Sequence, residues 1–404
     1  MPNGILQSYR IAFTGLSRET WLLSIVILVN RCGYMAVPFM SMYVTQNLHR
    51  SVADAGLIIT LFGVGSVAGA MAGGYFTDKW GFRQVQVISL IMSGVFFILF
   101  SLVTDFTALC GLVIVLSFFV EAFKPANSTA IAAYSTTANL TRSYALNRLA
   151  TNIGFGFGTS VGGILAAINY HLLFWVDGVV YMIAGILIVI LLPKAKVNRE
   201  RQKDQVDEFL GKSPWKDGFF LRFLTMVTLY MVCFSILFRL VPVYWKEQMH
   251  IGEATIGMLL GMNGLIIALF EMVLIQNLRD RWPDSVYIVA GVIFSALSFL
   301  ALVVPFVLPI VLAGFAVLLF TIGEMLAIPY ITTFVMNRAM DSNRGKYSAA
   351  YSVAQAVAQI VGPATGGIVA AHWGYQPLWA GLIVVSVFCA FGFRVLFLRE
   401  TRVG

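Results

Sequence analysis

Twelve stretches of this chain are apolar and long enough to cross a lipid bilayer, which takes about 20 residues. They cover roughly residues 21–45, 53–75, 84–104, 107–134, 145–168, 172–193, 218–246, 254–277, 286–305, 307–337, 347–371 and 376–398. The composition agrees, because 59% of the residues are hydrophobic and only 11% are charged. The sequence therefore predicts an all-α membrane protein with twelve transmembrane helices.

The positions of Lys and Arg predict how the chain is inserted. If the N-terminus is cytoplasmic, most of the basic residues between spans lie inside, and little beyond Arg50 and Lys246 remains outside. We therefore expect a multi-pass protein of the bacterial inner (plasma) membrane with both termini cytoplasmic. The net charge of +8 follows from this topology and does not indicate nucleic-acid binding, so membrane lipid is the expected partner.

The second half of the chain repeats features of the first. Glu324 with Pro329 follows Glu121 with Pro125 by about 203 residues, and Gly366–Ala371 repeats Gly162–Ala167. Such symmetry is typical of transporters in which two bundles move around a central site. We predict an N-terminal six-helix bundle over 1–193, a cytoplasmic linker over 194–216 and a C-terminal six-helix bundle over 217–404.

Ionisable residues inside the spans are the first candidates for function. Glu121 and Lys124 share one helical face, and Arg31 with Tyr34 lies well inside the first span. A charge in the middle of the bilayer costs roughly 2.5–3.5 kcal/mol on insertion scales, so it normally faces a partner or a water-filled cavity. A Glu121–Lys124 ion pair with no further role is the alternative. Further intramembrane candidates are Arg239, Asn263, Glu271, Glu324 and Gln355.

The stretch Gly73–Arg83 reads GGYFTDKWGFR, which resembles the loop between spans 2 and 3 of the major facilitator superfamily. Together with twelve spans and a two-fold repeat, this resemblance implies the major facilitator fold over the whole chain. It also implies that Asp78 and Arg83 form a cytoplasmic gate, with Asp280 and Arg281 in the second copy.

Within that superfamily, three spans resemble the proton-coupled oligopeptide transporters. The matching strings are Phe123–Ser128 (FKPANS), Gly323-Glu324 with Pro329, and Arg31 with Tyr34; Asn152 and Gly154 match another motif of that family. The resemblance implies that Arg31 and Lys124 face the carboxylate of a small peptide and that Glu324 holds its amino group. Tyr34, Asn127, Asn152, Arg239, Asn263 and Gln355 complete the expected substrate-binding set.

The chain departs from the peptide-transporter pattern in its first span. Ile27 and Asn30 stand where that family has glutamates, so its usual proton site is missing. Our hypothesis is that Glu121 replaces it, because its protonation would release Lys124 for the substrate. Glu271 and Glu324 are the alternative proton carriers. The expected function is proton-coupled secondary transport of di- or tripeptide-like zwitterions by alternating access.

Two other functions remain open. A proton-coupled efflux antiporter for drugs or lipophilic compounds shares the overall plan, although span 5 lacks the proline expected there and only Gly362-Pro363 in span 11 fits. A non-transporting membrane receptor or enzyme is the second, although no catalytic residues and no metal-ligand spacing are recognised. We therefore expect a transporter and not an enzyme, a monomer with a peptide or other small-molecule substrate, and no cofactor besides the proton gradient.

Overall fold

The computed structural model describes residues 15–136, 139–193, 214–278, 281–303, 308–338 and 344–400. The first half of the chain forms α2 (Arg18–Cys32), α3 (Ala36–Met42), the short π-helix η1 (Tyr43–Asn47), α4 (Val52–Trp80), α5 (Phe82–Leu102), α6 (Phe106–Ala133), α7 (Leu140–Ile168) and α8 (Tyr170–Leu191). The second half forms the 3-10 turn η2 (Pro214–Lys216), α10 (Gly218–Glu247), α11 (Glu253–Leu278), α12 (Asp284–Val303), α13 (Pro309–Arg338), α14 (Arg344–Trp373) and α15 (Tyr375–Glu400). The described residues contain no strand.

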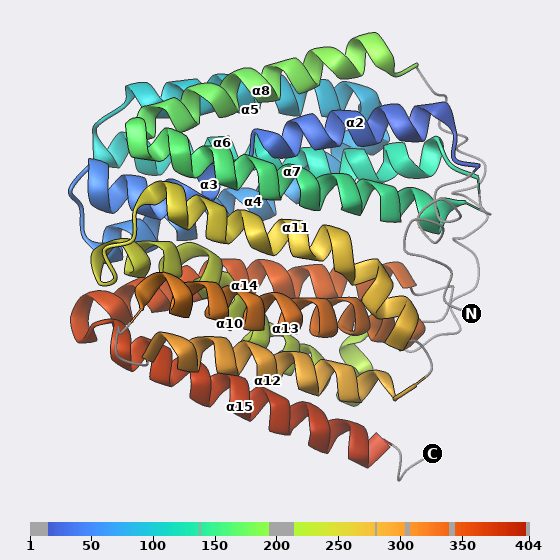
Figure 1. Ribbon diagram of the computed structural model, residues 1–404. Helices are drawn as coiled ribbons and strands as arrows, with labels where there is room; N and C mark the ends of the chain where they lie inside the picture. Colours follow the sequence, from blue (N-terminus) through green and yellow to red (C-terminus); the bar gives the residue numbers. More distant parts are fainter. Residues whose placement is uncertain are drawn as a thin grey trace. The chain divides into compact units, whose positions relative to one another are not determined.

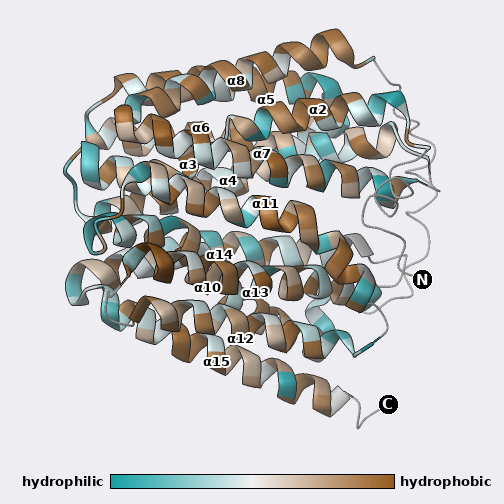
Figure 2. Ribbon diagram, viewed as in Figure 1, coloured by the Kyte–Doolittle hydropathy of each residue, from teal (hydrophilic) through white to brown (hydrophobic). Residues whose placement is uncertain are grey.

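Twelve helical segments among the described residues are long and apolar enough to cross a membrane, with α2, α3 and η1 together forming the first of them. Figure 2 shows hydrophobic residues along most of the length of these helices. Large apolar side chains such as Met71, Ile190 and Phe391 are mostly exposed on helix surfaces, as expected where lipid is the solvent. The predicted fold class, an all-α protein with twelve spans, is confirmed.

The helices group into two compact units. Unit 1 comprises residues 1–48, 61–197 and 252–273, and unit 2 comprises residues 49–60, 198–251 and 274–404. The grouping thus assigns most of α11 to unit 1 and the first turns of α4 to unit 2. The predicted bundle limits at 193 and 217 stay a prediction, and residues 194–213 of the predicted linker lie outside the described residues.

The same pairs of spans pack together in each unit, as the internal repeat predicts. In unit 1, α5 lies against α6 and α8, and α2 lies against α7. In unit 2, α12 lies against α13 and α15, and α10 lies against α14; the labels in Figure 1 identify these helices. Counted within each half of the chain, the third span packs against the fourth and the sixth, and the first span packs against the fifth.

The side chains that cap α2 and α10 repeat one arrangement. Ser17 accepts a hydrogen bond from the Thr20 N–H at 3.1 Å and donates to the carbonyl of Tyr134, just beyond α6, at 2.7 Å. Asp217 accepts a hydrogen bond from the Phe220 N–H at 3.1 Å and is paired with Arg338, the last residue of α13, at 2.8 Å. In both units, the N-cap of the first span therefore also holds the end of the fourth span.

Aromatic rings fill the interior of each unit. In unit 1, the rings of Tyr43 and Phe174 lie 4.8 Å apart, and those of Phe100 and Phe174 lie 4.9 Å apart. In unit 2, Phe223 and Phe334 are 4.5 Å apart within the cluster that α10, α12, α13, α14 and α15 share. These packed interiors fix the helix faces that carry the polar residues described next.

Candidate functional site

A polar pocket of about 210 Å³ lies within unit 1, among α2, α6 and α7. Its lining residues are Ile27, Arg31, Phe123, Lys124, Asn127, Ser128, Ile131, Tyr144, Asn147 and Thr151. Three predicted substrate-binding residues, Arg31, Lys124 and Asn127, are therefore brought together here. All of the residues that line the pocket belong to unit 1.

A break in the first span positions Arg31 at the end of α2. Gly33 ends α2, and the buried Asp177 carboxylate accepts hydrogen bonds from the N–H of Met35 at 3.0 Å and of Ala36 at 2.7 Å. These are the N–H groups that the start of a new helix leaves without an intrahelical partner. Asp177 thus stabilises the break that leaves Arg31 in the last turn of α2.

Close packing of α7 holds Arg31 in place. A Cβ atom built on Gly154 would lie 2.6 Å from the Arg31 Cβ, so only glycine lets α7 approach α2 this closely. The guanidinium carbon of Arg31 lies 5.3 Å from the centre of the Tyr34 ring, within range of a cation–π interaction. Its Nε is buried and has no hydrogen-bond partner in the described part of the chain.

Helix α6 supplies the second cation together with its counter-ion. Lys124 Nζ lies 2.6 Å from the Glu121 carboxylate, as the spacing of three residues predicts. Glu121 is buried, with 10% of its side chain exposed, whereas 49% of the Lys124 side chain is exposed. Pro125 follows at once and lacks the N–H that would otherwise bond to the Glu121 carbonyl. The lysine can therefore turn towards a ligand while its carboxylate partner stays buried.

Amides and hydroxyls complete the pocket wall. The Asn127 amide donates to Asn147 at 3.4 Å and its carbonyl oxygen accepts from Gln86 at 3.5 Å, while the hydroxyls of Ser128 and Tyr144 lie 2.9 Å apart. Buried atoms remain without partners among the described residues, namely Asn147 Nδ2 and Gln86 Oε1. Two cations beside amide donors form an environment that suits the binding of a carboxylate.

Tyr144, Asn147 and Thr151 were not among the predicted substrate-binding residues. They recur on α7 at intervals of three and four residues, which places them on one helical face. This polar stripe is the sequence signal that could have identified them. Tyr34 and Asn152 are half-buried in unit 1, and Asn263 is buried there, but none of the three lines the pocket.

A second charged pair lies within unit 1, between α7 and α11. Arg148 is paired with Glu271, whose side chain is 9% exposed, against 45% for that of Arg148. The two helices approach closely along glycines, because a Cβ atom on Gly264 would lie 2.8 Å from the Asn152 carbonyl oxygen. Sequence reasoning singled out Glu271 but missed Arg148 as its partner, because the two are 123 residues apart in the chain.

The remaining predicted residues are in unit 2 or at helix ends. Arg239 on α10, Glu324 on α13 and Gln355 on α14 are each half-buried. Among the gate residues, Asp78 is exposed near the end of α4, and Arg83 donates to the Val189 carbonyl of α8 at 2.8 Å. Arg281 follows α11, and Asp280 lies outside the described residues.

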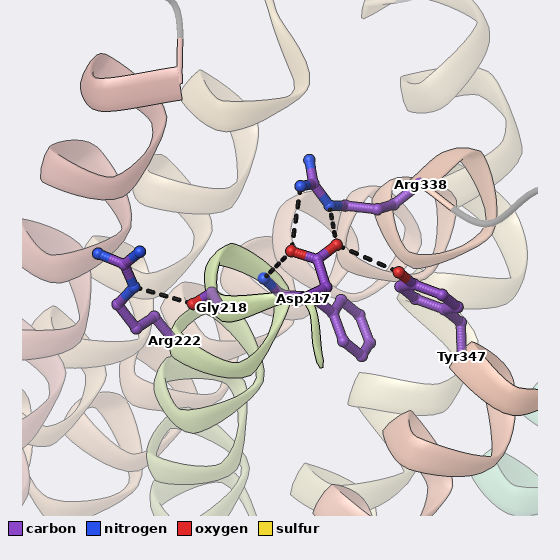
Figure 3. A network of polar contacts seen from close by, with 6 residues as sticks. Asp217, Gly218, Arg222, Arg338 and Tyr347 are labelled. Carbon is purple, nitrogen blue, oxygen red and sulfur yellow. Dashed lines mark hydrogen bonds and ion pairs between the residues drawn. The ribbon is translucent and has the colours of Figure 1, made fainter. Parts of the chain in front are cut away.

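A polar network within unit 2 joins the start of α10 to α13 and α14 (Figure 3). Asp217 accepts hydrogen bonds from Arg338 at 2.8 and 3.2 Å and from the Tyr347 hydroxyl at 3.1 Å, and so joins α10, α13 and α14. Burial raises the pKa of Asp217, but hydrogen bonds from Arg338 and the Phe220 N–H outweigh it and hold that pKa below its usual value. The carboxylate is therefore charged at neutral pH.

The described residues contain no group of three or more His, Cys, Asp or Glu side chains that could hold a metal ion. The cysteines Cys32, Cys110, Cys233 and Cys389 are all free thiols.

Comparison with known proteins identifies relatives over most of the chain. Residues 23–363 match the Major Facilitator Superfamily. The chain is 24% identical over 379 residues to the uncharacterized MFS-type transporter YttB of Bacillus subtilis, covering 92% of this chain and 93% of that protein. It is 24% identical over 311 residues to the quinolone resistance protein NorA of Staphylococcus aureus, covering 76% of this chain and 78% of NorA.

Solved structures share the fold at lower sequence identity. The nucleoside transporter NupG superposes with a TM-score of 0.78 at 16% identity, covering 94% of this chain and 99% of that one. A POT family transporter in complex with 5-aminolevulinic acid superposes with a TM-score of 0.77 at 13% identity, covering 95% of this chain and 96% of that one.

Proposed function

This chain belongs to the Major Facilitator Superfamily of membrane transporters, and we propose that it carries small peptide-like zwitterions across the bacterial inner membrane. Transport proceeds by alternating access of two bundles, 1–193 and 217–404, joined by the linker 194–216. The protein works as a monomer with both termini in the cytoplasm and uses the proton gradient in place of a cofactor.

The observation that carries this proposal is the pocket shared by Arg31 and Lys124. Two cations and the Asn127 amide can bind a carboxylate, and the buried Arg31 Nε provides a donor that no other described group uses. In the proposed mechanism, Glu324 of unit 2 binds the substrate amine. A ligand that binds the closed state more tightly than the open ones provides the differential affinity that a conformational change requires.

Proton coupling is assigned to Glu121. Its carboxylate holds Lys124 at 2.6 Å, so protonation breaks the ion pair and frees the lysine for the substrate carboxylate. Glu271 and Glu324 are the alternative carriers, and the Glu271–Arg148 pair offers the same chemistry within unit 1. Asp78, Arg83, Asp280 and Arg281 serve as cytoplasmic gate residues in this scheme.

Transport into proteoliposomes tests the proposal. Under an imposed pH gradient, we expect uptake of a free-ended dipeptide and none of the same dipeptide with both ends blocked. Charge-assisted hydrogen bonds contribute about 1.5–3 kcal/mol, so Arg31→Gln or Lys124→Gln should weaken binding about 10- to 100-fold. Equal affinity of these variants and the wild type would refute the carboxylate site.

A matched pair of variants tests the coupling. Glu121→Gln should abolish accumulation against a gradient but keep downhill exchange. Glu19 is in the first turn of α2 and does not line the pocket, so Glu19→Gln should change neither. Accumulation by Glu121→Gln at the wild-type level would exclude Glu121 as the proton carrier. The same assay with Glu271→Gln and Glu324→Gln then identifies which alternative carries the proton.

Efflux of drugs or lipophilic compounds is the second candidate function. It is favoured by the similarity to the quinolone resistance protein NorA over 76% of the chain. A thermal-shift screen separates the two, because free-ended peptides should stabilise a peptide carrier and cationic dyes should stabilise an exporter. Stabilisation by dyes alone would exclude the peptide carrier and support the exporter.

A further inference from the structure

A groove of about 310 Å³ follows the outer surface of unit 2, between α10 and α15. Its lining residues are Arg222, Thr225, Met226, Phe388, Phe391, Gly392, Val395 and Leu396. The α15 members recur at intervals of three and four residues, so they form one stripe on that helix. Both helices are long and apolar enough to span a membrane, so the solvent that fills a groove on their outer surface is lipid.

Large side chains and one glycine shape this groove. Phe388 and Phe391 project from α15, with 55% and 66% of their surfaces exposed. Gly392 forms the floor, because a Cβ atom there would lie 2.5 Å from the Met226 sulfur. A gap between exposed rings, floored by a residue without a side chain, suits a flexible hydrocarbon chain.

A cation stands at one end of the groove. Arg222 is the fifth residue of α10, and its Nε donates to the carbonyl of Gly218, one turn earlier, at 2.9 Å. Figure 3 shows that its guanidinium group lies on the other side of α10 from the Asp217–Arg338 pair. Its two terminal nitrogens have no hydrogen-bond partner in the described part of the chain. Guanidinium N–H groups arranged in this way match the oxygens of a phosphate.

From these observations we propose that the α10–α15 groove is a binding site for an anionic phospholipid. One acyl chain lies between Phe388 and Phe391 over Gly392, and the headgroup phosphate binds Arg222. An apolar groove by itself does not select among lipids, because every lipid tail is equally apolar. Selectivity for the negative headgroup therefore comes from Arg222.

Lipid titration of the purified protein, followed by native mass spectrometry, tests the site. The probes are dioleoylphosphatidylglycerol, which is anionic, and dioleoylphosphatidylcholine, which is zwitterionic. A basic residue near a membrane surface contributes about 1 kcal/mol towards an anionic lipid, so we expect the wild type to prefer phosphatidylglycerol about fivefold. Arg222→Gln should bind both lipids equally, and Arg222→Lys should keep most of the preference.

Two matched glycine substitutions on α15, one inside the groove and one outside it, test the groove itself. Gly392→Leu fills the groove and should remove the preferred lipid, at the cost of moving only the flexible end of Met226. Gly381→Leu makes the same change on the same helix, where nothing lies within 4 Å of the added Cβ, and should bind like the wild type. If Gly392→Leu proves unstable, the Arg222 variants still decide the result.

Three outcomes would overturn the proposal: no preference in the wild type, an unchanged preference in Gly392→Leu or Arg222→Gln, or equal losses in Gly392→Leu and Gly381→Leu. Competition by soluble glycerol phosphate at the same concentration as the lipid would also overturn it, because the site would then be one for a soluble anion.

Discussion

Replacing Asp217 tests whether its ion pair with Arg338, and not only its capping of α10, stabilises unit 2. Asp217→Asn keeps a side-chain acceptor for the Phe220 N–H, since Asn and Asp cap helices about equally well. It removes the charge that binds Arg338. Asp217→Ala removes both interactions, so the difference in unfolding free energy between the two variants measures the contribution of the helix cap.

The magnitude follows from the exposure of the pair. Hydrogen bonds to charged groups contribute about 1.5–3 kcal/mol, and exposure of the partner lowers that value. Because 26% of the Arg338 side chain and 11% of that of Asp217 are exposed, we expect a cost of about 1.5–2 kcal/mol for Asp217→Asn. Losing the cap adds about 1 kcal/mol, which gives roughly 2.5–3 kcal/mol for Asp217→Ala.

The assay is the free energy of unfolding in mild detergent, from a titration with sodium dodecyl sulfate followed by circular dichroism. Asp105 provides the control, because it caps α6 through the Ala108 N–H at 2.8 Å and has no ion-pair partner among the described residues. Asp105→Asn should cost little, and Asp105→Ala about 1 kcal/mol. A stability of Asp217→Asn within about 0.5 kcal/mol of the wild type would show that the ion pair with Arg338 does not stabilise the protein.

The pH dependence gives an independent check. The pKa of Asp217 is lowered from 3.8, so its contribution is fully present above that pH and is lost as the pH falls through the lowered pKa. The stability difference between the wild type and Asp217→Asn should therefore be constant from pH 8 to about 5 and shrink below about pH 4. If this stability difference instead grew as the pH fell, the pKa of Asp217 would not be lowered by folding.

Three further changes test the helix contacts of unit 1. Gly154→Val should destabilise the protein by about 1–3 kcal/mol through overpacking against α2, whereas Gly111→Val, in open space, should cost much less in the same unfolding assay. Asp177→Ala leaves two buried backbone N–H groups without their acceptor and should cost about 2–5 kcal/mol, with Asp177→Asn recovering part of the loss. A double-mutant cycle on Arg148→Gln and Glu271→Gln should give a coupling energy of about 1 kcal/mol, and additive effects would contradict a direct ion pair.

Local patterns were sufficient for the parts of the site that one helix contains. The pairing of Glu121 with Lys124 follows from their spacing, because residues three apart share a helical face. The twelve spans follow in the same way from apolar length alone. Each of these statements depends on residues close together in the chain.

Contacts between helices could not be predicted in this way. Asp177 lies within the predicted span 172–193, but the sequence gives no reason why its carboxylate should cap a break 141 residues earlier, at Ala36. Nor does it show that Arg148 meets Glu271 or that Asn147 completes the pocket beside Arg31. Which faces meet depends on helix rotation and on glycine contacts, such as that of Gly154 against α2.

Twelve membrane spans in two related halves, with a few charges inside the apolar spans, are predicted from the order of the residues alone. Length, apolarity and spacing along one helix are enough for that, because lipid imposes the same requirement on every span. Which of those charges share a pocket and which are paired is visible only in the folded protein, because close packing of helices distant in the chain sets the distances between their side chains.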